Sequence, residues 1–138
     1  MTLTGRLHPL LVHFPIALVL TAAAAELISL APSFSQWHVV AVTNVRAAAA
    51  CAIASAGAGW VLASSRMVEP SAVLEWHRWL GLAAAAAVLA ASLATSSMDR
   101  VPGRLWLYRI ALFWAAALVV AAGHFGAVLV WGTDFLRP

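Results

Sequence analysis

Four long apolar runs constrain this chain more than any other feature of its sequence. Each is about 20 residues or longer, which is the length at which an α-helix crosses the hydrocarbon of a bilayer. They lie at about 9–30, 37–63, 77–98 and 105–131. The runs are rich in Ala and Leu and lack the two-residue alternation of a membrane β-barrel. We therefore predict an all-α integral membrane protein that folds as an antiparallel four-helix bundle.

Composition and charge agree with lipid as the solvent of this chain. Of the 138 residues, 64% are hydrophobic and 9% are charged, which is more apolar surface than a soluble domain of this size can bury. We expect one domain over residues 1–138. The net charge of +3 comes from arginines alone, without a basic run or stacked aromatics, so anionic lipid is expected and nucleic acid is not. These features do not decide whether the protein forms an oligomer.

Tryptophans mark two faces of the predicted bundle. Face A is defined by Trp60, Trp76, Trp79 and Trp131, and face B by Trp37 and Trp106. Four crossings place both termini on face A. The arginines divide evenly between the faces, but the compact loop at 99–109 (DRVPGRLWLYR) favours face B as the cytoplasmic one.

Four of the five histidines are expected in the half of the membrane next to face A. His8 and His13 open the first helix, His77 opens the third, and His124 lies seven residues before the end of the fourth. At a rise of 1.5 Å per residue, His13 and His124 would both lie about 5–10 Å from the bilayer centre. Only His38 belongs to face B, where we expect an interfacial role. Ionisable residues inside a membrane usually face a bundle interior, a partner or a cofactor.

Haem is the cofactor that these histidines best predict. Neutral imidazole is a standard axial ligand of haem iron, and helix bundles build such sites from facing side chains. Gly81, Gly123 and Gly126 lie next to the histidines and would let a flat macrocycle approach the backbone. Cys51 has no C-x-x-C-H around it, so the haem would be held non-covalently, as haem b.

The first pair of axial ligands that we expect is His13 with His124, because their depths match best. His77 is the substitute ligand, and His8 with His77 could serve a second haem. With two imidazoles on the iron no position is left for oxygen chemistry, which predicts an electron-transfer subunit of an oxidoreductase complex rather than an enzyme by itself. We expect no catalytic residues. Electrons would pass between a periplasmic redox partner and quinone or another membrane carrier.

Two other functions fit the same residues. Three or four imidazoles could bind copper, zinc or non-haem iron directly, without haem. Alternatively, the protein is a structural membrane anchor or assembly subunit, and its histidines bond only to backbone and headgroups. Under that hypothesis His8 before Pro9 is simply a helix start, and His77 faces the interface.

Two further residues of the first helix carry expectations. Pro15 cannot donate to the carbonyl of Leu11, which predicts a bend that swings the His13 ring toward the bundle axis. Glu26 lies in the half next to face B and is expected to be neutral, or to pair with Arg46 or Arg109. A proton or quinone role for Glu26 is a further hypothesis.

Three segments resemble the pattern of a known family. They are HPLLVHFPIAL at 8–18, HRWLG at 77–81 and GHFGAVLVWGTDFL at 123–136. Together they resemble a bacterial family of small membrane proteins, domain of unknown function 2231, and in particular its branch associated with cytochrome c domains. That resemblance implies electron transfer with a periplasmic cytochrome c or dehydrogenase subunit. It also implies a multi-pass protein of the bacterial inner membrane with periplasmic termini. The chain departs from the family at Ala127, where a second glycine is usual after Gly126.

Overall fold

The computed structural model describes residues 3–65, 68–97 and 101–134, with side chains from Leu7 onward, except that of Ser97. Helices α1 (Leu3–Leu11) and α2 (His13–Ser29) together form the first crossing, followed by the short 3-10 turn η1 (Pro32–Phe34). Helix α3 (Trp37–Ala63), helix α4 (Ala72–Ala94) with the short turn η2 (Thr95–Ser97), and helix α5 (Arg104–Trp131) complete the chain. Four stretches are long and apolar enough to cross a membrane, as predicted: Leu7–Ser29, Trp37–Ala63, Ala72–Ala94 and Arg104–Trp131.

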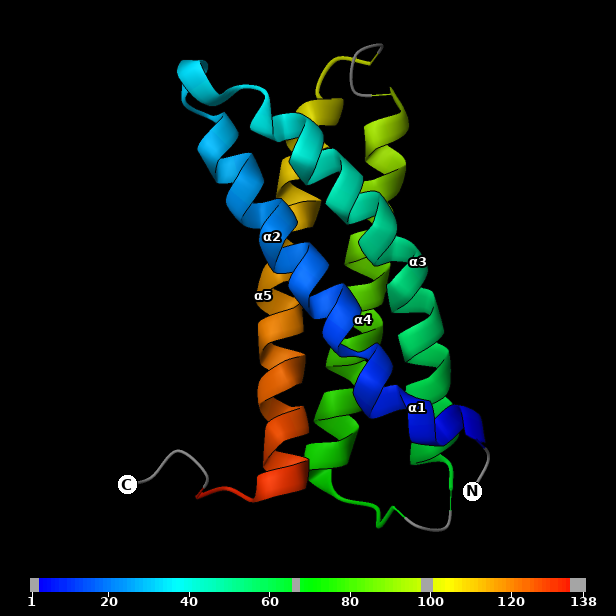
Figure 1. Cartoon of the computed structure of the whole chain (residues 1–138). Helices are drawn as coiled ribbons and strands as arrows, with labels where there is room; N and C mark the ends of the chain where they lie inside the picture. Colours follow the sequence, from blue (N-terminus) through cyan, green and yellow to red (C-terminus); the bar gives the residue numbers. More distant parts are fainter. Residues whose placement is uncertain (1–2, 66–67, 98–100, 135–138) are drawn as a thin grey trace.

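The crossings alternate in direction and form the predicted antiparallel bundle (Figure 1). The start of α1, the end of α3, the start of α4 and the end of α5 lie at the lower end of the figure, which is face A. The upper end is face B. The closest pairings are α4 with α5 and α2 with α3, while α1 packs against α3.

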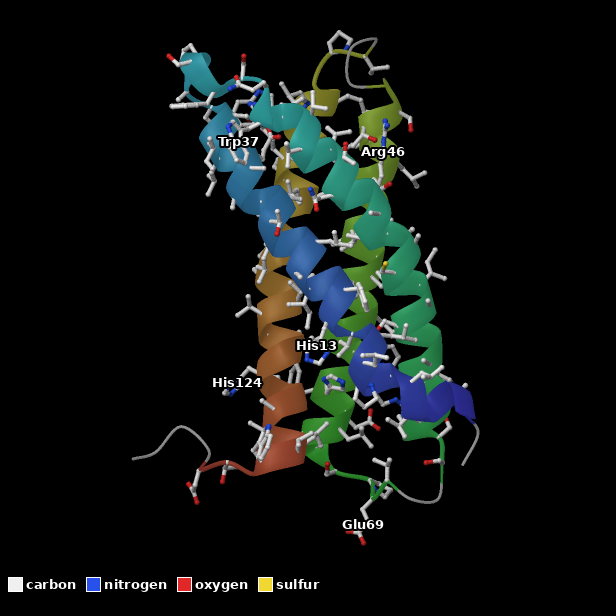
Figure 2. The ribbon with its side chains drawn as sticks, viewed as in Figure 1. His13, Trp37, Arg46, Glu69 and His124 are labelled. Carbon is white, nitrogen blue, oxygen red and sulfur yellow. The ribbon has the colours of Figure 1, made fainter. Side chains whose placement is uncertain are left out.

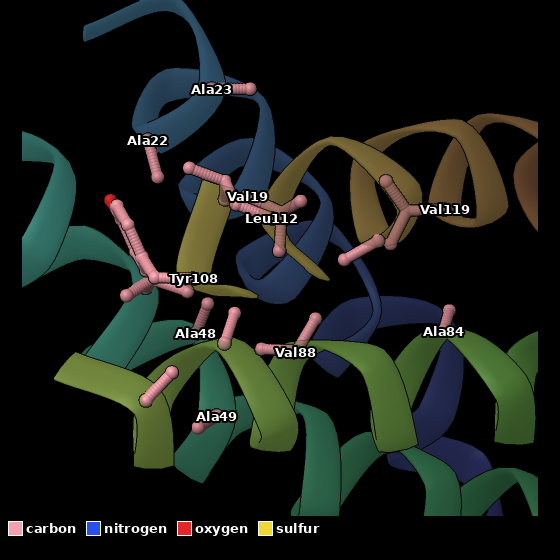
Figure 3. Packing of buried hydrophobic residues seen from close by; sticks show 14 residues of the cluster. Val19, Ala22, Ala23, Ala48, Ala49, Ala84, Val88, Tyr108, Leu112 and Val119 are labelled. Atoms are coloured by element: carbon pink, nitrogen blue, oxygen red, sulfur yellow. The ribbon is translucent and has the colours of Figure 1, made fainter. Parts of the chain in front are cut away.

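Alanine fills most of the interior, and large apolar side chains point outward. The core contains alanines from α2, α3, α4 and α5 around a few larger residues: Val19, Val45, Val88, Tyr108, Leu112 and Val119 (Figure 3). In contrast, Leu93, Ile110 and Trp114 are among the most exposed residues. Small side chains let helix backbones approach closely, which is how helices associate in lipid, where no hydrophobic force drives them together. The outward leucines and tryptophans are left on the surface that suits contact with lipid.

Helix bounds differ from the predicted ones where local capping decides them. Helix α4 begins at Ala72, five residues before the predicted start at 77, because the Ser71 hydroxyl caps it by accepting a hydrogen bond from the Leu74 amide at 3.2 Å. It ends at Ala94; Met98, the predicted end, lies outside the described residues. Helix α5 ends at Trp131, as predicted, and is capped by Gly132, whose φ of +81° is a conformation that glycine adopts without strain. The second helix has the predicted bounds, 37–63.

A candidate metal-ligand pair at face A

A break between α1 and α2 positions the first histidine. Pro15 is buried and has no amide hydrogen to donate to Leu11, and the helix is interrupted three residues earlier, at Val12. The chain therefore bends, as predicted. The consequence differs from the prediction, because α1 turns away from α2 and lies across the lower end of α3 (Figure 1). The bend brings His8, rather than His13, to the bundle.

The His8 ring packs against a glycine of α3, Gly59. Its Nδ1 lies 3.0 Å from the carbonyl oxygen of Ser55. A Cβ added at Gly59 would lie 2.7 Å from His8 Cε1, which is closer than real Cβ contacts come. Only glycine at this position lets the imidazole come this close to the helix backbone. The sequence places Gly59 near face A but does not indicate its contact with His8, which lies 51 residues away.

The His77 ring packs against a glycine of α5, Gly126, in the same way. Its Nδ1 lies 2.9 Å from the carbonyl oxygen of Ala122, and a Cβ added at Gly126 would lie 3.1 Å from its Cε1. Two aromatic contacts hold α4 in place on either side. The Trp76 ring stacks on Phe125 with centroids 6.3 Å apart, and the Arg78 guanidinium lies 4.3 Å from the centre of the Trp60 ring.

These two rings, which we call the histidine pair, lie next to each other. Their centroids are 6.2 Å apart, with an angle of 74° between the planes. A backbone carbonyl only accepts hydrogen bonds, so the Nδ1 of each neutral ring carries the proton, and Nε2 carries the lone pair. Histidine ligands of metals typically donate their other N–H to a carbonyl in just this way, which fixes the tautomer and the orientation of the ring.

The spacing of the pair suits one metal ion between two imidazoles. A metal–nitrogen bond is about 2.0–2.1 Å long, and each ring adds about 1 Å from Nε2 to its centre. Two rings on opposite sides of one ion therefore have centres roughly 6 Å apart, whereas a tetrahedral site brings them closer. Within the described residues, no group of three or more His, Cys, Asp or Glu side chains could hold a metal ion. The histidine pair would therefore supply two imidazole donors to a metal ion or to a haem iron.

The pair predicted first is not placed inside the bundle. The rings of His13 and His124 are both exposed, and His124 points away from the helices, next to Phe125 (Figure 2). Both lie in the lower half of the bundle, so their depth agrees with the prediction and their direction does not. Of the three predicted glycines, Gly126 receives the His77 ring, while Gly81 and Gly123 have open space where a Cβ would be.

A second polar group, which we call the Glu26 cluster, lies near face B. The Glu26 side chain is completely buried. Its Oε1 accepts a hydrogen bond from Arg109 Nε at 2.7 Å, and its Oε2 lies 2.7 Å from His38 Nδ1 and 3.3 Å from the Tyr108 hydroxyl. Of the two predicted partners, Arg109 is therefore the actual one. Arg46 instead donates to Thr95, at 2.9 Å.

His38 has more than the interfacial role expected from its position. Its ring contacts the Glu26 carboxylate and lies edge-on to Tyr108, with centroids 5.7 Å apart. Two signals in the sequence indicated this cluster: a lone acid within an apolar run, and polar residues at matching depth in the next helix and the last one. These signals indicated only how deep the residues lie in the membrane. Residues at the same depth need not contact one another.

Comparison with known proteins assigns the chain to a family. Residues 5–135 match the family model described as "Predicted membrane protein (DUF2231)". The chain therefore belongs to this family, in agreement with the resemblance of its three segments. No curated protein and no solved structure matches the chain.

Proposed function

We propose that this protein is a membrane b-type cytochrome, in which His8 and His77 hold haem near face A. The observation that carries the proposal is the histidine pair: two rings 6.2 Å apart, each with Nδ1 on a carbonyl of a different helix. When bound, haem would accept and donate single electrons. Since both axial positions would be taken by imidazole, the function that follows is electron transfer rather than oxygen chemistry.

The chain's own contribution is to prepare the two rings before the cofactor arrives. The Ser55 and Ala122 carbonyls fix the tautomer in which Nε2 is free to bind a metal. Gly59 and Gly126 fix the position of each ring on its helix. The site then joins α1, α3, α4 and α5, and binding of a cofactor would tie the otherwise peripheral α1 to the bundle.

The partners proposed for the cytochrome follow from the orientation of the membrane. The loop at 99–109 favours face B as cytoplasmic, which would put the histidine pair near the periplasmic side of a bacterial inner membrane. A periplasmic cytochrome c or dehydrogenase subunit would exchange electrons at that side. Quinone or another membrane carrier would be the second partner.

The test is a reduced-minus-oxidised visible spectrum of protein purified from cells supplied with haem precursor. We expect sharp α and β bands from the wild type, and their loss in His8→Ala and His77→Ala. His13→Ala and His124→Ala are matched controls, because they remove exposed imidazoles from the same half of the membrane. Bands that survive without the histidine pair, or no bands in the wild type, would overturn the proposal. Metal analysis of the same samples would then identify a bare copper, zinc or iron ion.

A further inference from the structure

An open groove lies beside the Glu26 cluster, on the other face of the membrane from the histidine pair. It has a volume of about 420 Å³ and is lined by Leu30, Trp106, Arg109, Ile110, Phe113 and Trp114. Such a volume falls in the range of sites for small organic ligands. Most of the lining residues are exposed on the outside of the bundle, where lipid is expected, so a ligand would enter from the membrane.

Among the described residues, Arg109 is the only charged one in the groove wall. Its Nε is used by Glu26, but a guanidinium has four further N–H donors. Its Cζ lies 5.8 Å from the centre of the Trp106 ring. The remaining wall consists of apolar or aromatic side chains: four from α5, and that of Leu30, which directly follows α2. A ligand that fits this wall has a flat apolar ring and one hydrogen-bond acceptor.

The charge balance around Arg109 decides between two classes of membrane ligand. The positive charge of Arg109 is already compensated by the buried Glu26 carboxylate at 2.7 Å. A phosphate of an anionic lipid would add an uncompensated negative charge, which is costly in a site of low dielectric. A neutral carbonyl oxygen would accept a hydrogen bond without that cost. The cluster therefore favours a neutral ligand.

We propose that the groove binds the head group of a quinone, with Arg109 donating to a quinone carbonyl and Trp106, Phe113 and Trp114 surrounding the ring. The quinone would be the membrane carrier of the proposed function. Only its role in electron transfer rests on that function. Binding itself needs no haem. Arg109 and Ala122, which contacts His77, lie 13 residues apart on α5, or about 20 Å.

The test is calorimetric titration of ubiquinone-1 into purified protein in nanodiscs of phosphatidylcholine. Ile110→Trp is designed to fill the groove, and Val120→Trp is its matched control, because it adds the same side chain at another exposed position of α5. We expect saturable binding to the wild type, at least a tenfold weaker affinity in Ile110→Trp, and a change of less than twofold in Val120→Trp. Circular dichroism melting would confirm that both variants fold.

Three results would overturn the inference: no saturable binding to the wild type, equal binding to both tryptophan variants, or displacement of the quinone by phosphatidylglycerol in mixed nanodiscs. The last result would identify an anionic-lipid site instead. The His8→Ala/His77→Ala double variant separates this inference from the proposed function. It should lack haem and still bind ubiquinone-1 with wild-type affinity, and a loss of binding in that variant would count against a separate quinone site.

Discussion

The two polar sites of this protein differ in what they leave unsatisfied. In the Glu26 cluster both carboxylate oxygens have partners, and the buried charge is matched by Arg109. In the histidine pair each ring has one backbone partner at Nδ1, and the described residues offer Nε2 no second one. The Glu26 carboxylate is satisfied as the chain folds, while the histidine pair presents two lone pairs. The satisfied carboxylate is expected to stabilise the fold, although Arg109 keeps N–H donors for a ligand, and the histidine pair is expected to bind.

The comparison predicts the largest effect on stability at Glu26. Glu26→Leu leaves Arg109 without its partner, and we expect the free energy of unfolding to fall by about 3 kcal/mol. The haem spectrum should be unchanged, because the histidine pair lies near the other face. Steric-trap unfolding in bicelles would measure the free energy.

Two controls sharpen this prediction. Glu75→Ala removes an exposed carboxylate 3.7 Å from Arg78 and should cost less than about 0.5 kcal/mol. The double variant Glu26→Leu/Arg109→Leu removes both charges and should recover most of the lost stability. If the double variant is as unstable as the single one, the ion pair is not the source of the effect.

The next largest effect is expected at Gly59. Gly59→Ala places a methyl group 2.7 Å from His8 Cε1 and should displace the ring from Ser55. We expect the affinity for haem to fall about tenfold, or roughly 1.4 kcal/mol. Gly57→Ala is the control on the same helix, since nothing lies within 4 Å of its added Cβ. Equal haem affinity in the two variants would show that the His8 ring, in its position against Gly59, is not a haem ligand.

A smaller effect is expected at the start of α4. Ser71→Ala removes the cap of that helix and should cost about 1 kcal/mol of stability. His77 lies in the turn that follows the loosened one, so haem should dissociate faster, as followed by transfer to apomyoglobin. Ser64→Ala, at the exposed end of α3, is the control and should change stability by less than about 0.5 kcal/mol. Equal effects of the two serines would contradict a capping role.

The smallest effect is expected at Gly126. A Cβ there would lie 3.1 Å from His77 Cε1, so the ring needs to shift by only a few tenths of an ångström. We expect Gly126→Ala to weaken haem binding by about threefold, which is less than 1 kcal/mol. Gly123→Ala, with open space at its Cβ, should bind haem as the wild type does. If Gly126→Ala lowers the affinity for haem more than Gly59→Ala does, the contact of His77 with Gly126 is the more sensitive of the two, contrary to this prediction.

Much of the architecture was predictable from the sequence. The length of each apolar run fixed the four crossings, and Pro15 indicated the bend in the first of them. The depth of each histidine followed from its distance to a helix end. Glu26 and Arg109 were recognised as candidate partners, because a buried acid in lipid needs a cation. The early start of α4 at Ala72 was missed, although Pro70 and Ser71 carry the signal for a helix start.

The sequence by itself therefore determined that this is a membrane bundle, and at what depth each polar residue lies. Only the tertiary structure decided which side chains face one another: His8 with His77, and Glu26 with His38 and Arg109. The physical reason is that depth depends on the constant rise of a helix, whereas direction depends on how the helix is rotated about its axis. These helices are apolar on every side, so no polar face in the sequence records that rotation. It is set by close packing of alanines and glycines between helices.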